Sequence, residues 1–438
     1  MFSVAFHTLG CKVNQVETNA LSELFRQKGF KIVEFGGAAD LYVVNTCCVT
    51  KTSEQKARQF IRRAHKLNPA APILVTGCYA QIAPERLLAM PGVSLVSGTK
   101  GRMEIADSAL EIMEKKPSPV NRVTPFTGRE DFEEITAAEY AGRTRATLKI
   151  QEGCDNYCAY CVVPLARGPV RSMAPERALA RIGEMAASGF KEVVLSGVHL
   201  GLYGKDLFGR AVLAELVRDA VRIPGLARLR LGSLDPQDVT EELLELMAGD
   251  TILCPHFHLS LQSGSDEILR RMGRRYDTAF FADVAGGIRR RARRETALST
   301  DLIVGFPGET EALFAETVSF IKKIGFSRLH IFPFSTRPGT PASSMDGQVS
   351  AGIKKERAAA VKKVADEMSY AFHRRFLGKS VVVLAEEKKK ENWTGYNIQY
   401  VQVFFPDSGT DWRNKLVRVR VTRAARGGLY GAVESADI

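Results

Sequence analysis

Three cysteines within eight residues constrain this chain more than any other feature. Cys154, Cys158 and Cys161 have the spacing Cys-x3-Cys-x2-Cys and follow the strand-like run Ala146–Ile150. Three thiolates this close together can bind three irons of a cubane iron–sulfur cluster, which leaves the fourth iron open for a substrate or cofactor. A structural zinc site requires four protein ligands, and the nearest histidine downstream in the sequence is His199. The triplet therefore favours an iron–sulfur cluster over a zinc site or three packed thiols.

Length and composition indicate a chain of several domains outside the membrane. At 438 residues the chain is long enough for two or three domains, and its apolar content of 45% is ordinary for a globular protein. No run approaches the roughly 20 apolar residues of a membrane helix. The Met1–Gly10 segment lacks the basic start and apolar core of a signal peptide, so we expect a cytoplasmic protein without a membrane partner. Eight cysteines in such a chain indicate metal ligands rather than disulfides.

Residues 1–116 alternate strand and helix patterns, which predicts an α/β domain with a parallel sheet. Three strand-like runs are each followed by a cysteine: Ser3–Leu9 by Cys11, Leu41–Asn45 by Cys47, and Pro72–Thr76 by Cys78. Because the carboxyl ends of parallel strands share one edge of the sheet, we expect these thiols to converge on a second metal centre. Three independent buried thiols are the alternative, since free cysteine is often a core residue. Cys48 adjoins Cys47, and spacing alone does not choose between the two.

A polar connector over residues 117–142 precedes a second α/β region, residues 143–376. The strand-like runs of this region are Ala146–Ile150, Glu192–Ser196, Arg228–Gly232, Phe257–Leu261, Ala297–Val304 and Arg328–Phe332. Six strand–helix units predict an open, partial (β/α)6 barrel, whose active site lies at the C-terminal ends of the strands. Ser196, Gly197, Ser233 and Gln262 occupy those ends. An arginine group that includes Arg274 follows; it either holds phosphate or forms a solvated helix face.

The last part of the chain, residues 377–438, carries short strand patterns after a long helical stretch. Val417–Val421 strictly alternates apolar and basic residues. A small β-barrel with basic strands and exposed aromatic side chains is a common RNA-binding arrangement. The candidate aromatic residues are Trp393, Tyr396, Tyr400 and Trp412. Together with the net charge of +12, the tail predicts contact with RNA; a structural β-domain that covers the barrel opening is the alternative.

The motifs and their order resemble the methylthiotransferase family of the radical S-adenosylmethionine superfamily, over essentially the whole chain. The matching stretches are Thr8–Gln15, Asn45–Cys47, Thr76–Cys78, the Cys154 triplet with Tyr160, Ala166–Gly168, His258–Ser265, Gly305–Thr310 and Arg337–Thr340. By this resemblance Cys47, not Cys48, is the metal ligand. The tail is similar to the TRAM domain, a small RNA-binding module.

The resemblance implies two [4Fe–4S] clusters and S-adenosyl-L-methionine as cofactors. Cys154, Cys158 and Cys161 would be the catalytic cysteines that hold the cluster forming a 5′-deoxyadenosyl radical. Cys11, Cys47 and Cys78 would hold an auxiliary cluster that carries the delivered sulfur. The residues expected to contact the cofactor are Tyr160, Arg167, Ser196, Gly197, Ser233 and Gln262. An external one-electron reductant of the flavodoxin or ferredoxin type would be required.

The opening motif Leu9–Gln15 looks most like the branch of the family that acts on N6-threonylcarbamoyladenosine beside the tRNA anticodon. This implies a transferase that converts the nucleoside to its 2-methylthio derivative by radical sulfur insertion at a C–H bond and methyl transfer. The anticodon stem-loop of tRNA would then be the partner. Related branches act on isopentenyladenosine in tRNA or on a ribosomal-protein aspartate, and both remain alternatives. A non-catalytic RNA-binding protein with structural zinc is a third alternative.

Overall fold

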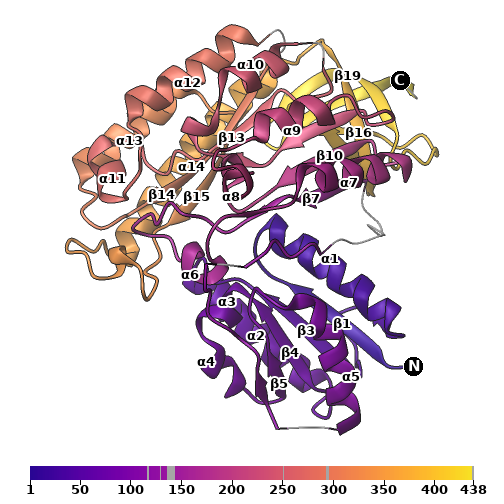
Figure 1. Cartoon of the computed structure of the whole chain (residues 1–438). Coiled ribbons are helices and arrows are strands. Elements are labelled where there is room, and N and C mark those ends of the chain that lie inside the picture. Colours follow the sequence, from indigo (N-terminus) through magenta and orange to yellow (C-terminus); the bar gives the residue numbers. More distant parts are fainter. Residues whose placement is uncertain (116–117, 129, 136–143, 250, 293–294, 437–438) are drawn as a thin grey trace.

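The computed structural model describes residues 1–115, 118–128, 130–135, 144–249, 251–292 and 295–436. Most of its strands belong to three systems: an N-terminal sheet, an arc of parallel strands, and a small closed barrel. Figure 1 shows the N-terminal sheet and its helices at the bottom, with the arc above them and the C-terminal barrel beside the arc. The predicted α/β fold with a terminal β-barrel is confirmed.

The N-terminal sheet has six parallel strands in the order β2-β1-β3-β4-β5-β6. They are β1 (Ser3–Thr8), β2 (Lys31–Val33), β3 (Leu41–Thr46), β4 (Ile73–Gly77), β5 (Val93–Val96) and β6 (Val120–Asn121). The helices are α1 (Lys12–Gln27), α2 (Lys51–Leu67), α3 (Cys78–Ile82), α4 (Pro84–Leu88) and α5 (Ile105–Lys115). α1 and α5 pack on one face and α2, α3 and α4 on the other, so the central strands β3 and β4 are wholly buried.

The predicted connector over residues 117–142 is not free of secondary structure. Its segment β6 extends the N-terminal sheet by pairing with β5. Glu133 from the connector accepts a hydrogen bond from Arg102 at 2.9 Å. Residues 117, 129 and 136–142 of the connector lie outside the described part of the chain.

The arc consists of two parallel sheets, β11-β10-β7 and β12-β13-β14-β15. Its strands are β7 (Arg145–Lys149), β10 (Glu192–Ser196), β11 (Arg228–Leu231), β12 (Ser233–Leu234), β13 (His256–Leu259), β14 (Ala297–Val304) and β15 (Arg328–Pro333); a small ribbon, β8 (Gln151–Glu152) with β9 (Arg171–Ser172), lies at its edge. Only Gly232 separates β11 from β12, so the two sheets form one continuous arc. This is the partial barrel that the sequence predicts.

Helices cover the convex side of the arc. They include α7 (Pro175–Ala187), α9 (Leu213–Ala220), α10 (Glu241–Ala248), α12 (Thr278–Arg291) and α13 (Glu311–Ile324). Four further helices lie at the ends and edges of the arc: α6 (Val163–Arg167), α8 (Lys205–Phe208), α11 (Asp266–Arg271) and α14 (Ala351–Arg374). Alternate strand residues such as Phe257 and Leu302 pack in the core with these helices. Because side chains alternate along a strand, His258 and Asp301 face the concave side instead.

The C-terminal barrel closes in the strand order β16-β17-β18-β20-β19. The strands are β16 (Ser380–Lys389), β17 (Asn392–Asn397), β18 (Gln402–Pro406), β19 (Leu416–Ala425) and β20 (Gly428–Ala436). Trp393 is 5% exposed inside the barrel core, so the expectation that it lies on the surface is wrong: its position on β17 faces inward. Trp412 is also partly buried against this core.

The turn between β17 and β18 docks against the strand starts of the arc. The Arg145 guanidinium lies 4.8 Å from the ring centroid of Tyr396, and the Arg230 guanidinium 4.8 Å from that of Tyr400. Arg230 also donates to the Ile398 carbonyl at 3.0 Å. Tyr396 and Tyr400 are therefore committed to a contact within the protein. At this turn the tail covers the barrel opening, as one of the two sequence interpretations predicts.

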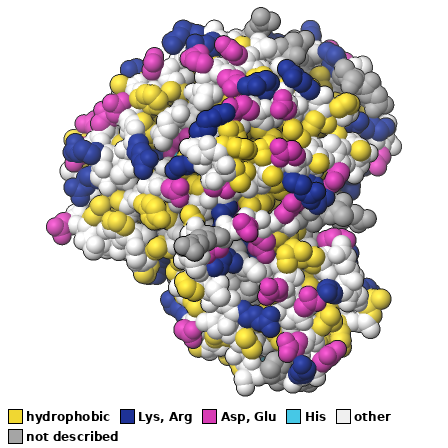
Figure 2. Space-filling model, viewed as in Figure 1, with side chains coloured by type: hydrophobic (Ala, Val, Ile, Leu, Met, Phe, Trp, Pro, Cys, Tyr) yellow, Lys and Arg dark blue, Asp and Glu magenta, His cyan; other side chains and the backbone are white. Residues whose placement is uncertain are grey.

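On the face of the molecule that Figure 2 shows, charged side chains are dispersed rather than gathered by sign. Figure 2 shows Lys and Arg interspersed with Asp and Glu over the arc and the N-terminal sheet alike. Within the described residues, no helix is both long enough and apolar enough to cross a membrane.

Candidate active site with two thiol centres

The Cys154–Cys161 loop lies at the strand-end edge of the arc, directly after β8. Gly153 has a φ of +77°, and a Cβ atom there would lie 1.7 Å from the Pro169 carbonyl oxygen, so only glycine fits. Further along the loop, the Ala159 N–H donates to the Met272 carbonyl at 2.9 Å. The backbone of the loop is thus fixed on both sides by distant parts of the chain.

The three thiols of this loop lie close enough to influence one another. Burial, together with the charges of Cys158 and Cys154, raises the pKa of Cys161 to about 12. Thiolates in such surroundings need a metal or a cation to compensate them. Arg274, whose side chain is 5% exposed, donates from Nη1 to Cys158 Sγ at 3.3 Å and from Nη2 to Asp235 at 2.5 Å. The loop is therefore a site for negatively charged sulfur.

His199 follows β10 and reaches the same loop from the other side. Its Nδ1 lies 3.6 Å from Cys154 Sγ and its Nε2 lies 2.8 Å from Asp238 Oδ2. Burial alone lowers the pKa of His199, but the hydrogen bonds with Asp238 and Cys154 and the charge of Asp235 raise it to about 10. Both ring nitrogens of His199 thus have partners within the protein, Cys154 and Asp238. The loop itself supplies three thiols, which fits a cluster with one open iron.

The second group of thiols lies along one edge of the N-terminal sheet. Cys11, Cys47 and Cys78 follow the neighbouring strands β1, β3 and β4. A Cβ atom at Gly10 would lie 3.1 Å from Cys47 Sγ, so the loop after β1 passes directly over Cys47. Burial and the charges of Cys78 and Cys11 raise the pKa of Cys47 to about 11. The structure brings the three predicted thiols together; their binding of a metal stays a prediction.

Cys48 occupies a different environment from Cys47. It is 1% exposed and packs in the apolar core between the sheet and α2. Its hydrogen bond to Cys78, helped by the charge of Arg167, lowers the pKa of Cys78 to about 6 although burial acts in the opposite direction. Cys47 thus lies under the Cys11 loop, while Cys48 packs in the core and hydrogen-bonds Cys78, so the choice of Cys47 as the ligand stays a prediction.

Arg167, at the end of α6, joins the two thiol centres. Figure 1 shows α6 at the junction between the N-terminal sheet and the arc. The side chain is 2% exposed; its Nε donates to Cys78 Sγ at 3.2 Å, and its Nη1 donates to Glu152 at 2.6 Å and to Glu17 at 2.7 Å. The sequence predicts Arg167 at the S-adenosylmethionine site, whereas its observed contacts are with Cys78 and the two carboxylates. Arg167 therefore connects the second centre to the residue that precedes the Cys154 loop.

A buried charge network surrounds Arg167, and sequence reasoning did not find it. Two carboxylates, Glu17 and Glu152, meet three cations, Arg102, Lys149 and Arg167, and every one of these side chains is at most 2% exposed. The ion-pair distances are 3.0 Å for Arg102–Glu17, 3.2 Å for Arg102–Glu152, 3.4 Å for Lys149–Glu17 and 2.8 Å for Lys149–Glu152. Only Lys149 and Glu152 are near one another in sequence, and the other pairs join distant segments, so no local pattern signals the network.

The other predicted cofactor contacts lie near the strand ends of the arc. Ser196 is the buried last residue of β10, and Gly197 follows it. Ser233 is exposed in β12. Gln262 has a φ of +65°, and its backbone pairs with β14. Tyr160 packs beside an apolar cluster, and burial raises its pKa well above the usual value. Their contact with a cofactor stays a prediction.

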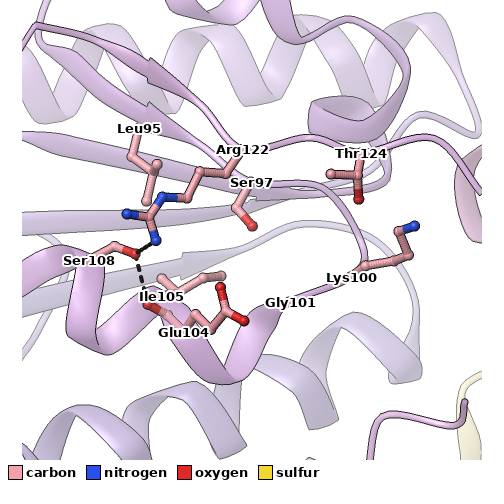
Figure 3. Close-up of a pocket in the computed structure, with 9 residues that line it drawn as sticks. All are labelled: Leu95, Ser97, Lys100, Gly101, Glu104, Ile105, Ser108, Arg122 and Thr124. Atoms are coloured by element: carbon pink, nitrogen blue, oxygen red, sulfur yellow. Dashed lines mark hydrogen bonds between the residues drawn. The ribbon is translucent and has the colours of Figure 1, made fainter. Parts of the chain in front are cut away.

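A separate cavity lies at the outer edge of the N-terminal sheet, with a volume of about 190 Å³. Figure 3 shows Arg122 donating to Ser108 at its wall, and this hydrogen bond is 2.5 Å long. The cavity lining includes Ser97, Lys100 and Glu104 but none of the predicted site residues. It is not part of the thiol centres.

Two family descriptions match the two halves of this architecture. Residues 3–98 match an uncharacterized protein family, UPF0004, and residues 148–321 match the radical SAM superfamily. Among solved structures, the radical S-adenosylmethionine methyltransferase TsrM from Kitasatospora setae has a TM-score of 0.57 and 17% identity, covering 78% of this chain and 75% of that chain. This likeness shows the fold alone.

Curated relatives match nearly the whole chain. The threonylcarbamoyladenosine tRNA methylthiotransferase MtaB of Bacillus subtilis is 40% identical over 97% of this chain and 94% of that protein. The protein of the same name from Thermotoga maritima is 40% identical over 92% of this chain and 91% of that protein. A tRNA-2-methylthio-N(6)-dimethylallyladenosine synthase of Desulfitobacterium hafniense is 35% identical over 96% and 95%. Because the likeness extends over both thiol centres and the arc that joins them, this chain belongs to the methylthiotransferase family of radical S-adenosylmethionine enzymes.

Proposed function

We propose that the enzyme converts N6-threonylcarbamoyladenosine beside the tRNA anticodon to its 2-methylthio derivative. The observation that carries this proposal is the pair of thiol centres linked through Arg167, which contacts Cys78 of one centre and Glu152 beside the other. Relatives that are named for this substrate and are 40% identical over nearly the full length support the choice of branch.

We propose that each thiol group holds a [4Fe–4S] cluster. Cys154, Cys158 and Cys161 would hold the cluster that binds S-adenosyl-L-methionine, with Tyr160, Ser196, Gly197, Ser233 and Gln262 as candidate contacts. Cys11, Cys47 and Cys78 would hold the auxiliary cluster. When bound, these cofactors supply the one-electron chemistry that an unactivated aryl C–H bond requires.

The residues around the thiols prepare the site for that chemistry. Arg274 and His199 direct N–H donors at Cys158 and Cys154, which stabilises negative charge on sulfur. Asp235 and Asp238 fix the orientation of those donors through hydrogen bonds. At the second centre Arg167 gives the Cys78 sulfur a buried cationic donor. These contacts keep both sulfur sets in place while a substrate enters or leaves.

We propose that the C-terminal barrel contributes to binding the anticodon stem-loop. On β18, β19 and β20, Phe404 stacks on Tyr430 with a centroid distance of 4.9 Å, and the Arg423 guanidinium lies 3.8 Å from the Tyr430 centroid. Arg418 and Arg420 are exposed on β19. Stacked aromatic and arginine planes next to exposed cations suit single-stranded RNA. A tRNA substrate also implies a cytoplasmic location. The proposed cluster chemistry requires an external one-electron reductant of the flavodoxin or ferredoxin type.

The proposed division assigns residues 1–116 to the auxiliary-cluster domain and residues 117–142 to a connector. Residues 143–376 would be the radical domain and residues 377–438 the TRAM-like domain. The N-terminal sheet, the arc and the C-terminal barrel each have an apolar cluster formed mainly by their own residues, which supports this division.

Mass spectrometry of tRNA nucleosides tests the substrate. Deletion of the gene is expected to abolish 2-methylthio-N6-threonylcarbamoyladenosine and to leave the unmethylthiolated nucleoside in its place. Restoring the gene is expected to bring the product back, whereas a copy with Cys158→Ala is not. Loss of the isopentenyl derivative instead would assign the enzyme to the other tRNA branch. An unchanged tRNA profile, in cells without a second enzyme of this class, would refute the proposal.

A further inference from the structure

The concave face of the arc carries a polar cluster that neither thiol centre uses. His258 on β13, Asp301 on β14 and His330 on β15 each place one polar atom within 4.8 Å of the others. His258 Nε2 lies 3.3 Å from Asp301 Oδ1, and the rings of His258 and His330 are 5.6 Å apart. All three side chains are only partly buried. They form a polar wall that remains accessible from within the arc.

A line of contacts connects this wall to the loop of Cys11. Lys12, the next residue, lies with its Nζ 5.5 Å from the ring centroid of Tyr400. Tyr400 lies 5.2 Å from the ring of His256, and His256 shares the Ser299 hydroxyl with His258, each at 3.0 Å. Tyr400, His256 and Ser299 therefore link the wall to the residue that follows Cys11.

Positive charge exceeds negative charge around the wall. Lys12 is exposed at the start of α1, and Arg328 is exposed on β15, two residues before His330 on the same side of the strand. In the part of the chain that the structure describes, no carboxylate lies within ion-pair distance of either cation. Asp301, the acidic member of the wall, lies beside His258. A ligand group with a negative charge and further hydrogen-bonding atoms would suit these surroundings.

The proposed substrate has such a group, and this step rests on the proposed function. A threonylcarbamoyl substituent ends in a carboxylate and also carries a hydroxyl and ureido N–H donors. An isopentenyl substituent has no polar atom. A site built to bond polar groups rejects an analogue that lacks them, because its own donors and acceptors would be left without partners.

We infer that Lys12, His258, Asp301 and His330 form the pocket that receives the threonylcarbamoyl group. Lys12 and His330 donate to the carboxylate, while Asp301, which His258 holds in place, accepts from the hydroxyl or a ureido N–H. Because Lys12 adjoins Cys11, the substituent lies next to the centre from which sulfur is delivered. The pocket thus selects the nucleoside and holds it at the place of reaction.

Binding of short RNAs to the anaerobic, cluster-loaded enzyme tests this inference without turnover. Three anticodon stem-loops are compared by fluorescence anisotropy: one with the threonylcarbamoyl nucleoside, one with its methyl ester, and one with isopentenyladenosine. The wild-type enzyme is expected to bind the free acid about tenfold more tightly than the ester, since a charge-assisted hydrogen bond is lost in the ester. Lys12→Met and His330→Phe are expected to bring this ratio close to one.

Lys66→Met, on the exposed end of α2, is the matched control and is expected to keep the wild-type ratio. Iron content and thermal unfolding identify a variant that has failed to fold, and His258→Gln then provides a second variant of the wall. An unchanged ratio in the folded variants would overturn the inference. The inference would also be overturned if a divalent metal copurified with the wild-type enzyme and were lost in Asp301→Asn, because the wall would then be a metal site. When the binding ratio is unchanged, mass spectrometry of tRNA separates the two failures. If the methylthiolated threonylcarbamoyl product is absent from tRNA, the proposed function fails together with the pocket. If the product is present, only the pocket assignment is wrong.

Discussion

At the scale of single residues, neighbours in sequence have unlike environments. Cys47 faces the loop after β1 while Cys48 packs in the core. Arg270 has a side chain that is 71% exposed, whereas Arg274 is 5% exposed and bonds Cys158. Local composition treats each pair as equivalent, but burial and direction decide what each side chain contacts.

The cysteine pair gives the first prediction. Cys47→Ala is expected to lower the iron content from about eight to about four atoms per chain, because one cluster loses a ligand. Cys48→Ala is expected to retain about eight, at a cost in stability for the small cavity it leaves. Iron and sulfide analysis of anaerobically reconstituted protein measures both. Equal loss of iron in the two variants would contradict the assignment of Cys47.

The contrast between Arg270 and Arg274 gives the second prediction. Arg274→Gln removes a cation and a hydrogen bond from Cys158, so the reduced, more negative state of the bound cluster becomes less stable. Its reduction potential is expected to fall by about 50 mV, which corresponds to a hydrogen bond worth about 1 kcal/mol. Electron paramagnetic resonance during a redox titration measures this shift. Arg270→Gln is the control and is expected to leave the potential unchanged.

At the scale of elements, the contact between the β17–β18 turn and the arc depends on Glu192 at the start of β10. Glu192 is fully buried and binds Arg230 at 2.7 Å, and Arg230 in turn donates to carbonyls of the turn. Burial alone would raise the pKa of Glu192, but Arg230, Arg228 and Arg145 hold it at about 2. The tail and the arc are thus joined through an ionised carboxylate.

This carboxylate gives a pH-dependent prediction. Because the folded pKa of Glu192 is below its ordinary value of 4.5, its contribution to stability is full above about pH 4.5 and is lost as the pH falls towards 2. Glu192→Gln is expected to destabilise the protein by about 3 kcal/mol at pH 7, since it leaves buried arginines without their partner. It is also expected to flatten the fall in stability between pH 4.5 and 3, measured by urea unfolding. Glu215→Gln, which removes a partly exposed carboxylate paired with Arg210, is expected to show the wild-type pH profile.

At the scale of the whole molecule, the buried network of Glu17, Glu152 and Arg167 unites the N-terminal sheet with the arc. Glu17 belongs to α1, whereas Glu152 and Arg167 flank the Cys154 loop on either side in sequence. Arg337, from the loop after β15, adds a second link by pairing with Glu54 at 2.5 Å. The two thiol centres therefore keep a fixed relation to each other.

Glu17→Gln tests whether this network holds the N-terminal sheet and the arc together. Three buried cations then share fewer carboxylates, so the free energy of unfolding is expected to fall by about 3 kcal/mol. Glu23→Gln, on the same helix but half-buried and bonded to the exposed Arg26 and to Gln27, is expected to cost less than about 0.5 kcal/mol. Denaturant unfolding followed by circular dichroism measures both. A smaller effect at Glu17 than at Glu23 would refute the structural role of the network.

Prediction from sequence succeeds where the signal is local. Apolar strand runs followed by cysteines predict both the parallel sheet and the edge that its thiols share. The helical pattern begins at Glu17, yet α1 begins at Lys12, because the Cys11 loop turns directly into the helix. Contacts between distant segments, such as Arg167 with Glu17 or His199 with Cys154, depend on how the domains pack and leave no periodic trace. Trp393 was misjudged for a similar reason: its direction follows from barrel closure.

The β17–β18 turn, finally, has a consequence for the shape of the substrate. With this turn seated on the strand starts, the arc is obstructed at that end, and the polar wall of His258 and His330 must be reached from the side of the strand ends. A nucleotide stacked within an anticodon loop cannot extend that far. It has to swing out of the stack, at a cost of a few kcal/mol, before its ring can lie between the two thiol centres. RNA loops that unstack readily at this position should therefore be modified first.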